Sequence, residues 1–142
     1  HSARGKIYRY LIRNHHVILP HEADRVWMVP EKLDMELLRA AAATFVGRHD
    51  FRSFTVNRKA PAQTIRDISR ITVTKKGTLI ALTFHGKGFL YRMVRMLTGS
   101  MVRVAQGLDE FSTLENRLQN PVAPEWQHVA PAGGLCLIKV IY

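Results

Sequence analysis

The sequence predicts an α+β fold in which helices pack on one face of a mostly antiparallel sheet. Three observations carry this prediction. Residues 6–14 and both halves of residues 69–86 alternate apolar and polar side chains, and a period of two is typical of strands. Residues 35–47 and 88–107 instead carry apolar side chains at helical spacing. The order strand, helix, hairpin, helix, strand favours a single sheet covered by helices.

The charge and composition of the chain limit its class. It has 142 residues, the length of one domain, and 21 Lys and Arg against 11 Asp and Glu leave a net charge of +10. This excess favours a polyanionic partner, nucleic acid first and an anionic membrane surface second, although a soluble domain can simply be basic. No stretch of about 18 apolar residues could span a bilayer, so we expect a soluble, cytoplasmic protein with no membrane attachment.

Cysteine usage and the first residue add two expectations. Cys136 is the single cysteine, so no intrachain disulfide can form, and no Cys/His array has metal-ligand spacing. We therefore expect a reducing compartment, no metal and no cofactor. Because the chain begins with His1 rather than Met, we expect it to be a piece of a longer protein.

The first strand is predicted at residues 6–14. Alternation places Tyr8 and Tyr10 on one face and Arg9 and Arg13 on the other. Residues 15–33 contain two prolines and few periodic apolar side chains, so they are predicted to form a long connection with a short strand at 25–29.

The first helix is predicted to start after Asp34, a residue type that caps helix N-termini, and to stop at Gly47. A basic loop is predicted to follow. Two strands joined at Lys76–Gly77 come next. The cations of the predicted loop are Arg48, Arg52, Arg58, Lys59 and Arg66.

The second helix is predicted over residues 88–107. At about 100° per residue, Arg92, Arg95 and Arg103 fall on one ridge, beside the apolar stripe. A shorter helix is predicted at 110–120, before Pro121, and a central strand at 134–142, because both faces of that segment are largely apolar. The apolar stripe consists of Leu90, Met93, Val94, Leu97, Met101, Val104 and Ala105.

The chemistry-bearing residues each allow two interpretations. Tyr8 could stack on a base or accept a proton, or it could belong to the core. Arg95 could pair with a carboxylate or phosphate, or it could lie exposed with its stem over apolar surface. Arg58 and Lys59 could contact RNA phosphates or remain solvated. No acid–base pair, phosphate-binding glycine loop or metal-ligand spacing is visible.

Several segments together resemble the tRNA pseudouridine synthases of the TruA type. They are "SARGKIYRY", "GRHDFRSF", "TIRDI", "GKGFLYRMVRMLTGS" and "GLCLIKVIY", in this order and with compatible spacing. The resemblance covers the C-terminal half of such an enzyme, so it implies half of a pseudouridine synthase fold over residues 1–142. In that family the catalytic aspartate lies in an N-terminal segment resembling G-R-T-D-x-G-V-H, which is absent here.

The resemblance implies a reaction and two site residues. The missing aspartate would attack a flipped-out uridine of the tRNA anticodon arm, and the uracil would rejoin the ribose through carbon, without metal or cofactor. Tyr8 matches the active-site tyrosine, which stacks on the target base and can take its C5 proton. Arg95 matches the arginine that pairs with the catalytic aspartate and keeps it ionised. A homodimer is also implied.

Other interpretations stay open. Arg92 stands where histidine is frequent in the family. By their charge, Arg92 and Arg103 are predicted as phosphate or solvent contacts, like Arg58 and Lys59. The chain could be a non-catalytic basic RNA-binding module of the same fold, or an unrelated basic domain that binds DNA or an acidic protein. Because the aspartate is missing, residues 1–142 alone are predicted to be inactive.

Overall fold

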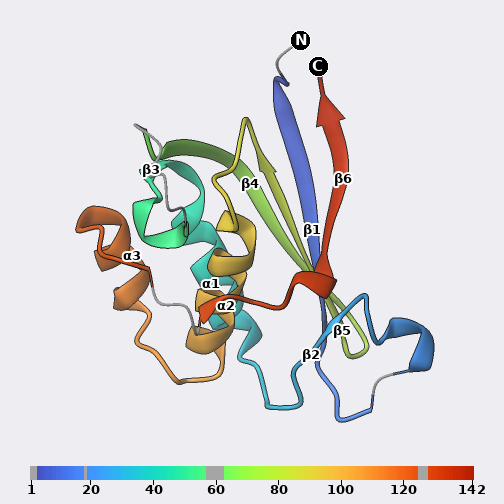
Figure 1. Cartoon of the computed structure of the whole chain (residues 1–142). Coiled ribbons are helices and arrows are strands. Elements are labelled where there is room, and N and C mark those ends of the chain that lie inside the picture. Colours follow the sequence, from blue (N-terminus) through green and yellow to red (C-terminus); the bar gives the residue numbers. More distant parts are fainter. Residues whose placement is uncertain (1–2, 18, 57–62, 125–127) are drawn as a thin grey trace.

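The computed structural model describes residues 3–17, 19–56, 63–124 and 128–142 and confirms the α+β class. Figure 1 shows the helices gathered on one side of the sheet. The helices are α1 (Met35–Phe45), α2 (Met93–Ala105) and α3 (Ser112–Gln119), with short 3-10 turns η1 (Pro20–Glu22), η2 (Arg52–Phe54) and η4 (Ala132–Gly134). The strands are β1 (Gly5–Arg13), β2 (Trp27–Met28), β3 (Gly47–Asp50), β4 (Ile65–Lys76), β5 (Leu79–Gly86) and β6 (Leu135–Ile141).

The sheet is mixed and mostly antiparallel, as predicted. Its order is β2-β1-β5-β4-β3, and β6 pairs with β1. One edge of β1 pairs with β5 along Lys6–Arg13. The other edge pairs with β6 along Gly5–Tyr10 and with β2 at Ile12 and Arg13. Among the pairs of described strands, the β1–β2 pair alone is parallel. Strand β1 is therefore the centre of the fold.

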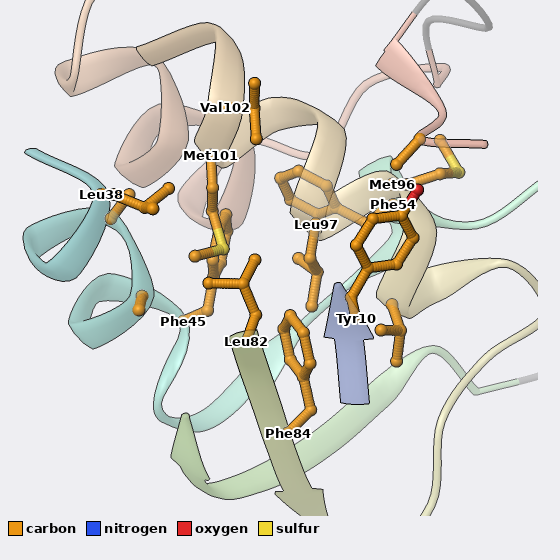
Figure 2. Close-up of a cluster of buried hydrophobic side chains, with 14 of the residues drawn as sticks. Tyr10, Leu38, Phe45, Phe54, Leu82, Phe84, Met96, Leu97, Met101 and Val102 are labelled. Atoms are coloured by element: carbon orange, nitrogen blue, oxygen red, sulfur yellow. The ribbon is translucent and has the colours of Figure 1, made fainter. Parts of the chain in front are cut away.

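The core lies between this sheet and the helices (Figure 2). The alternation of β1 and β5 turns Tyr10, Leu82 and Phe84 toward α2, whose Leu97 and Met101 face them, and all five are fully buried. Removing a buried Leu or Met side chain typically costs about 2–5 kcal/mol. This packing fixes the position of α2 over the sheet.

Helix α1 starts and ends where the sequence predicted. The Asp34 carboxylate accepts a hydrogen bond from the Leu37 amide at 3.1 Å, which satisfies one of the unpaired donors of the first turn. After the helix, Gly47 has φ 113°, a conformation that a residue with a Cβ rarely adopts, and it turns the chain into β3.

The predicted loop between α1 and the hairpin is partly strand. Arg48 lies in β3 opposite Asp67, and Arg66 lies in β4 opposite His49, so neither is a loop residue. The strand was missed because its side chains are polar on both faces. Arg52 lies in η2, whereas Arg58 and Lys59 lie outside the described residues.

Helix α2 starts five residues later than predicted. Arg92 has φ 58°, in the left-handed region, so the regular helix cannot extend back through it. Leu90 is nevertheless buried, because the loop before the helix folds it onto the core. All seven residues of the predicted apolar stripe are buried, but periodicity missed five further buried positions of α2, namely Met96, Thr98, Gly99, Ser100 and Val102. It also gave the wrong backbone for residues 88–92, so Arg92 does not share a helical ridge with Arg95 and Arg103.

The prediction of a central strand at the C-terminal end is wrong. Strand β6 pairs with β1 alone among the described strands, which makes it an edge strand. Three large apolar residues of β6 are exposed: Leu137 by 47%, Ile138 by 46% and Ile141 by 42%. Apolar side chains on both faces predicted a buried central strand. Instead, they belong to an edge strand that the described part of the chain leaves uncovered.

Candidate active site

Tyr8 lies on the helix-facing side of β1, beyond the buried core. It occupies the same face as Tyr10, two residues along the strand and hence roughly 7 Å away. Tyr10 is fully buried, whereas Tyr8 is half-buried. Among the described residues, no hydrogen bond of the Tyr8 hydroxyl is found. The strand therefore presents one tyrosine to the core and the next one to the surface.

Phe89 fixes the ring of Tyr8 and was missed by the sequence analysis. The two rings meet edge to face, with centroids 5.2 Å apart and planes at 89°. Gly86 permits this contact, because a Cβ there would lie 3.0 Å from Cζ of Phe89. The signal was available in "GKGFLY", but helical periodicity assigned Phe89 to a helix rather than to the loop that precedes one.

Strand β6 adds apolar surface beside Tyr8. The two strands are in register at Tyr8 and Leu137, so both side chains lie on the same face of the sheet. Leu137 is 47% exposed. Tyr8, Phe89 and Leu137 thus form a partly exposed apolar surface at the open end of the helix-covered face, suited to contact with a planar group.

Arg95 lies in the first turn of α2 and is half-buried. Its Nε donates to the carbonyl oxygen of Ala130 at 2.8 Å, while its own carbonyl accepts from the Ala130 amide at 3.0 Å. Within the described part of the chain, the guanidinium makes no other hydrogen bond or ion pair. The two Nη groups are therefore left to form a fork, the arrangement that binds a carboxylate or phosphate through two hydrogen bonds.

Tyr10 connects Arg95 to β1. Its hydroxyl donates to the carbonyl oxygen of Pro131 at 2.5 Å, the residue after the one that binds Arg95. Burial raises the pKa of Tyr10 well above its usual range, and the nearby charge of Arg95 acts in the opposite direction. Tyr10 is therefore a neutral donor at physiological pH. Residues 130 and 131 thus bring Arg95 toward the strand that carries Tyr8.

The remaining predicted RNA contacts differ in their surroundings. Arg92 lies 5.1 Å from the ring centroid of Tyr91, in a cation–π arrangement, and Tyr91 is 58% exposed. Arg103 instead forms an ion pair with Asp109, from Nε to Oδ2 at 2.8 Å and from Nη2 to Oδ1 at 3.2 Å. The two arginines therefore contact different kinds of side chain, an aromatic ring for Arg92 and a carboxylate for Arg103.

The described residues hold no group of three or more His, Cys, Asp or Glu side chains that could bind a metal ion. Over the same residues, no helix has the length and apolar character needed to cross a bilayer.

Comparison with known proteins identifies the family. The model of a family described as tRNA pseudouridine synthase matches residues 41–142. A tRNA pseudouridine synthase A of Pelobacter propionicus is 40% identical over 141 residues, which is 99% of this chain and 58% of that protein. Those of Citrifermentans bemidjiense and Acetivibrio thermocellus are 36% and 31% identical, over 99% and 100% of this chain. The chain spans about 58% of the length of these relatives. It belongs to the tRNA pseudouridine synthase family.

Proposed function

We propose that residues 1–142 form the C-terminal half of a tRNA pseudouridine synthase that isomerises uridine in the anticodon arm. The observation that carries this proposal is the environment of Arg95, whose Nε is bound by the Ala130 carbonyl while its Nη groups are uncommitted within the described residues. The relatives are longer than this chain, and a segment resembling G-R-T-D-x-G-V-H is absent from its sequence. The nucleophilic aspartate would then come from the other half.

Arg95 would act on that aspartate. A guanidinium beside a carboxylate lowers the carboxylate pKa and so keeps it ionised, as a nucleophile must be. Because the Nη fork offers two parallel donors, it would also fix the orientation of the carboxylate. The aspartate attacks the uridine at the ribose or the base, the bond from C1′ to N1 breaks, and a bond from C1′ to C5 replaces it.

Tyr8 would contact the flipped-out uracil base. A uridine within a stem or loop must leave its stack before its ring can turn, and an apolar surface compensates for the lost stacking. Base stacking on an aromatic side chain is worth about 1–3 kcal/mol. Tyr8, Phe89 and Leu137 supply such a surface. The Tyr8 oxygen would take the proton that leaves C5 after the new bond forms, as its hydroxyl gives up its own proton to solvent.

The other half of the enzyme would cover the exposed side of β6. Leu137, Ile138 and Ile141 are each more than 40% exposed, an unusual concentration of large apolar side chains on one short strand. A strand of the other half that pairs with the edge of β6 left unpaired by the described strands would cover part of both faces of β6 and complete a cleft with Tyr8 and Leu137 in its wall. This accounts for an edge strand with the composition of a central one.

The net charge of +10 supports tRNA as the polyanionic partner of this half. Our candidates for phosphate contacts are Arg58, Lys59, Arg92 and Arg103. The family resemblance further suggests a cytoplasmic homodimer, and sedimentation of the full-length enzyme tests the dimer directly.

Pseudouridine formation in tRNA transcripts tests the proposed function. The full-length enzyme and residues 1–142 alone should be assayed with equal amounts of transcript. We expect conversion by the full-length enzyme and none by residues 1–142. Conversion by residues 1–142 alone would refute the division of the active site between two halves. Salt-sensitive tRNA binding by the full-length protein without any conversion would instead identify a non-catalytic RNA-binding module.

A further inference from the structure

Residues 128–131, which we name the crossing segment, lie directly against helix α2 at Gly99. A Cβ on Gly99 would lie 1.6 Å from the carbonyl oxygen of His128 and 3.2 Å from the amide nitrogen of Ala130. No side chain fits in that space. The close approach of two backbones therefore requires glycine at this position, since the neighbouring atoms belong to the main chain and cannot rotate away.

The crossing segment binds Arg95 through the main chain at two points. The Ala130 amide donates to the Arg95 carbonyl oxygen, and the Ala130 carbonyl accepts from the Arg95 Nε. Gly99 lies four residues after Arg95, so the two residues are neighbours on the same face of α2. The position of the crossing segment on Gly99 thus sets where the Ala130 carbonyl meets the guanidinium.

The segment is held at both ends. Its last carbonyl, that of Pro131, accepts from Tyr10 in β1. At its first residue, the buried His128 ring lies between two charged side chains. Nη1 of Arg117 in α3 is 3.4 Å from Nδ1 of His128, and Oδ2 of Asp109 is 4.0 Å from Nε2 of His128. Asp109 is itself bound by Arg103 of α2. These contacts connect the crossing segment to the sheet and to both neighbouring helices.

We propose that the crossing segment positions the Arg95 guanidinium for its partner carboxylate, and that Gly99 is the positioning residue that makes this possible. An arginine side chain has several rotatable bonds and loses rotamer entropy when it is fixed. The Ala130 carbonyl fixes it before any partner arrives, which leaves the Nη fork pre-oriented. This inference rests on the function proposed above for Arg95.

The first test is Gly99→Ala in the full-length enzyme. To bring the new Cβ from 1.6 Å to the 3.0 Å below which such contacts are essentially never seen, the crossing segment must move by about 1.4 Å. A misplacement of about 1 Å at a catalytic group can cost about 10²-fold in rate. We expect a fall of this size in the single-turnover rate, with tRNA affinity within about twofold of the parent.

The second test avoids a steric clash. Asp109→Asn weakens the anchor of His128 without touching Arg95 or Gly99. Its matched control is Glu22→Gln, which weakens the ion pair between Glu22 and Arg13, at 2.7 Å, on the opposite side of β1 from α2. We expect Asp109→Asn to lower the single-turnover rate and Glu22→Gln to leave it unchanged, with both variants assayed well below their unfolding temperatures.

The outcomes separate this inference from the proposed function. If the parent enzyme forms no pseudouridine, the proposed function fails and no variant needs to be measured. If the parent is active but folded Gly99→Ala or Asp109→Asn converts tRNA at the parental rate, the positioning role is wrong. Should Gly99→Ala fail to fold, Asp109→Asn against Glu22→Gln still decides the question.

Discussion

Removing the hydroxyl should lower stability at one tyrosine of β1, Tyr10, and the catalytic rate at the other, Tyr8. Tyr10 is fully buried and donates to the Pro131 carbonyl, whereas the Tyr8 hydroxyl has no hydrogen-bond partner among the described residues. Tyr10→Phe and Tyr8→Phe therefore make the same chemical change, on the same face of one strand, in two different environments. Each serves as the control for the other.

The magnitude for Tyr10→Phe follows from the exposure of its partner. A hydrogen bond contributes about 0.5–1.5 kcal/mol net, and an acceptor left unpaired in the core costs about 1–3 kcal/mol. Pro131 is exposed, so water can reach part of its surroundings and the lower range applies. We expect Tyr10→Phe to lower the free energy of unfolding by about 1 kcal/mol and Tyr8→Phe by less than about 0.5 kcal/mol.

Urea unfolding and single-turnover conversion of tRNA provide the measurements. Tyr8→Phe should keep the parental unfolding midpoint but lose about 10²-fold in rate, the usual contribution of a positioned proton acceptor. Tyr10→Phe should shift the midpoint at constant m-value. Equal unfolding midpoints for the two variants would refute the hydrogen bond as the reason for the difference, and a parental rate in Tyr8→Phe would refute its role toward C5.

Two further predictions concern stability. Asp34→Ala removes the acceptor for the Leu37 amide, and we expect a loss of about 1 kcal/mol in urea unfolding; an unchanged midpoint would show that this cap contributes nothing. The hydrogen bond from Arg103 holds the pKa of Asp109 below its usual range, against the effect of burial. The Arg103–Asp109 interaction therefore makes its full contribution to the free energy of unfolding above the unfolded-state pKa of Asp109, about 3.9. That contribution is lost as the pH falls through the lower pKa of Asp109 in the folded protein. Unfolding midpoints of the parent should fall more steeply from pH 5 to pH 3 than those of Asp109→Asn; parallel pH profiles would contradict this assignment.

Local patterns in the sequence predicted most of the fold. Alternation gave β1 and the orientation of Tyr8 and Tyr10 within it, and the cap at Asp34 gave the start of α1. Such features depend on residues close together in the chain, where spacing determines which side chains share a face. The match to known enzymes singled out Arg95 among three arginines, which geometry alone had left equivalent.

The parts that were not predicted depend on distant contacts. The crossing segment has no periodicity, and its fit to Gly99 joins backbones 29 residues apart, from Gly99 to His128. The left-handed conformation of Arg92 interrupts a stretch that reads as continuous helix. The apolar composition of β6 predicted a central strand, but the described chain supplies a neighbour on one edge only, and its large apolar side chains are exposed.

The most direct test of the account is Arg95→Met in the full-length enzyme, with tRNA affinity and the single-turnover rate measured separately. Methionine keeps much of the apolar volume of the side chain and removes its charge and its fork of donors. If Arg95 pairs with the catalytic aspartate, the rate should fall by about 10²-fold or more while the dissociation constant for tRNA stays within about twofold. Loss of tRNA binding with the parental rate retained at saturating tRNA would show that Arg95 contacts a phosphate instead, and would contradict the account.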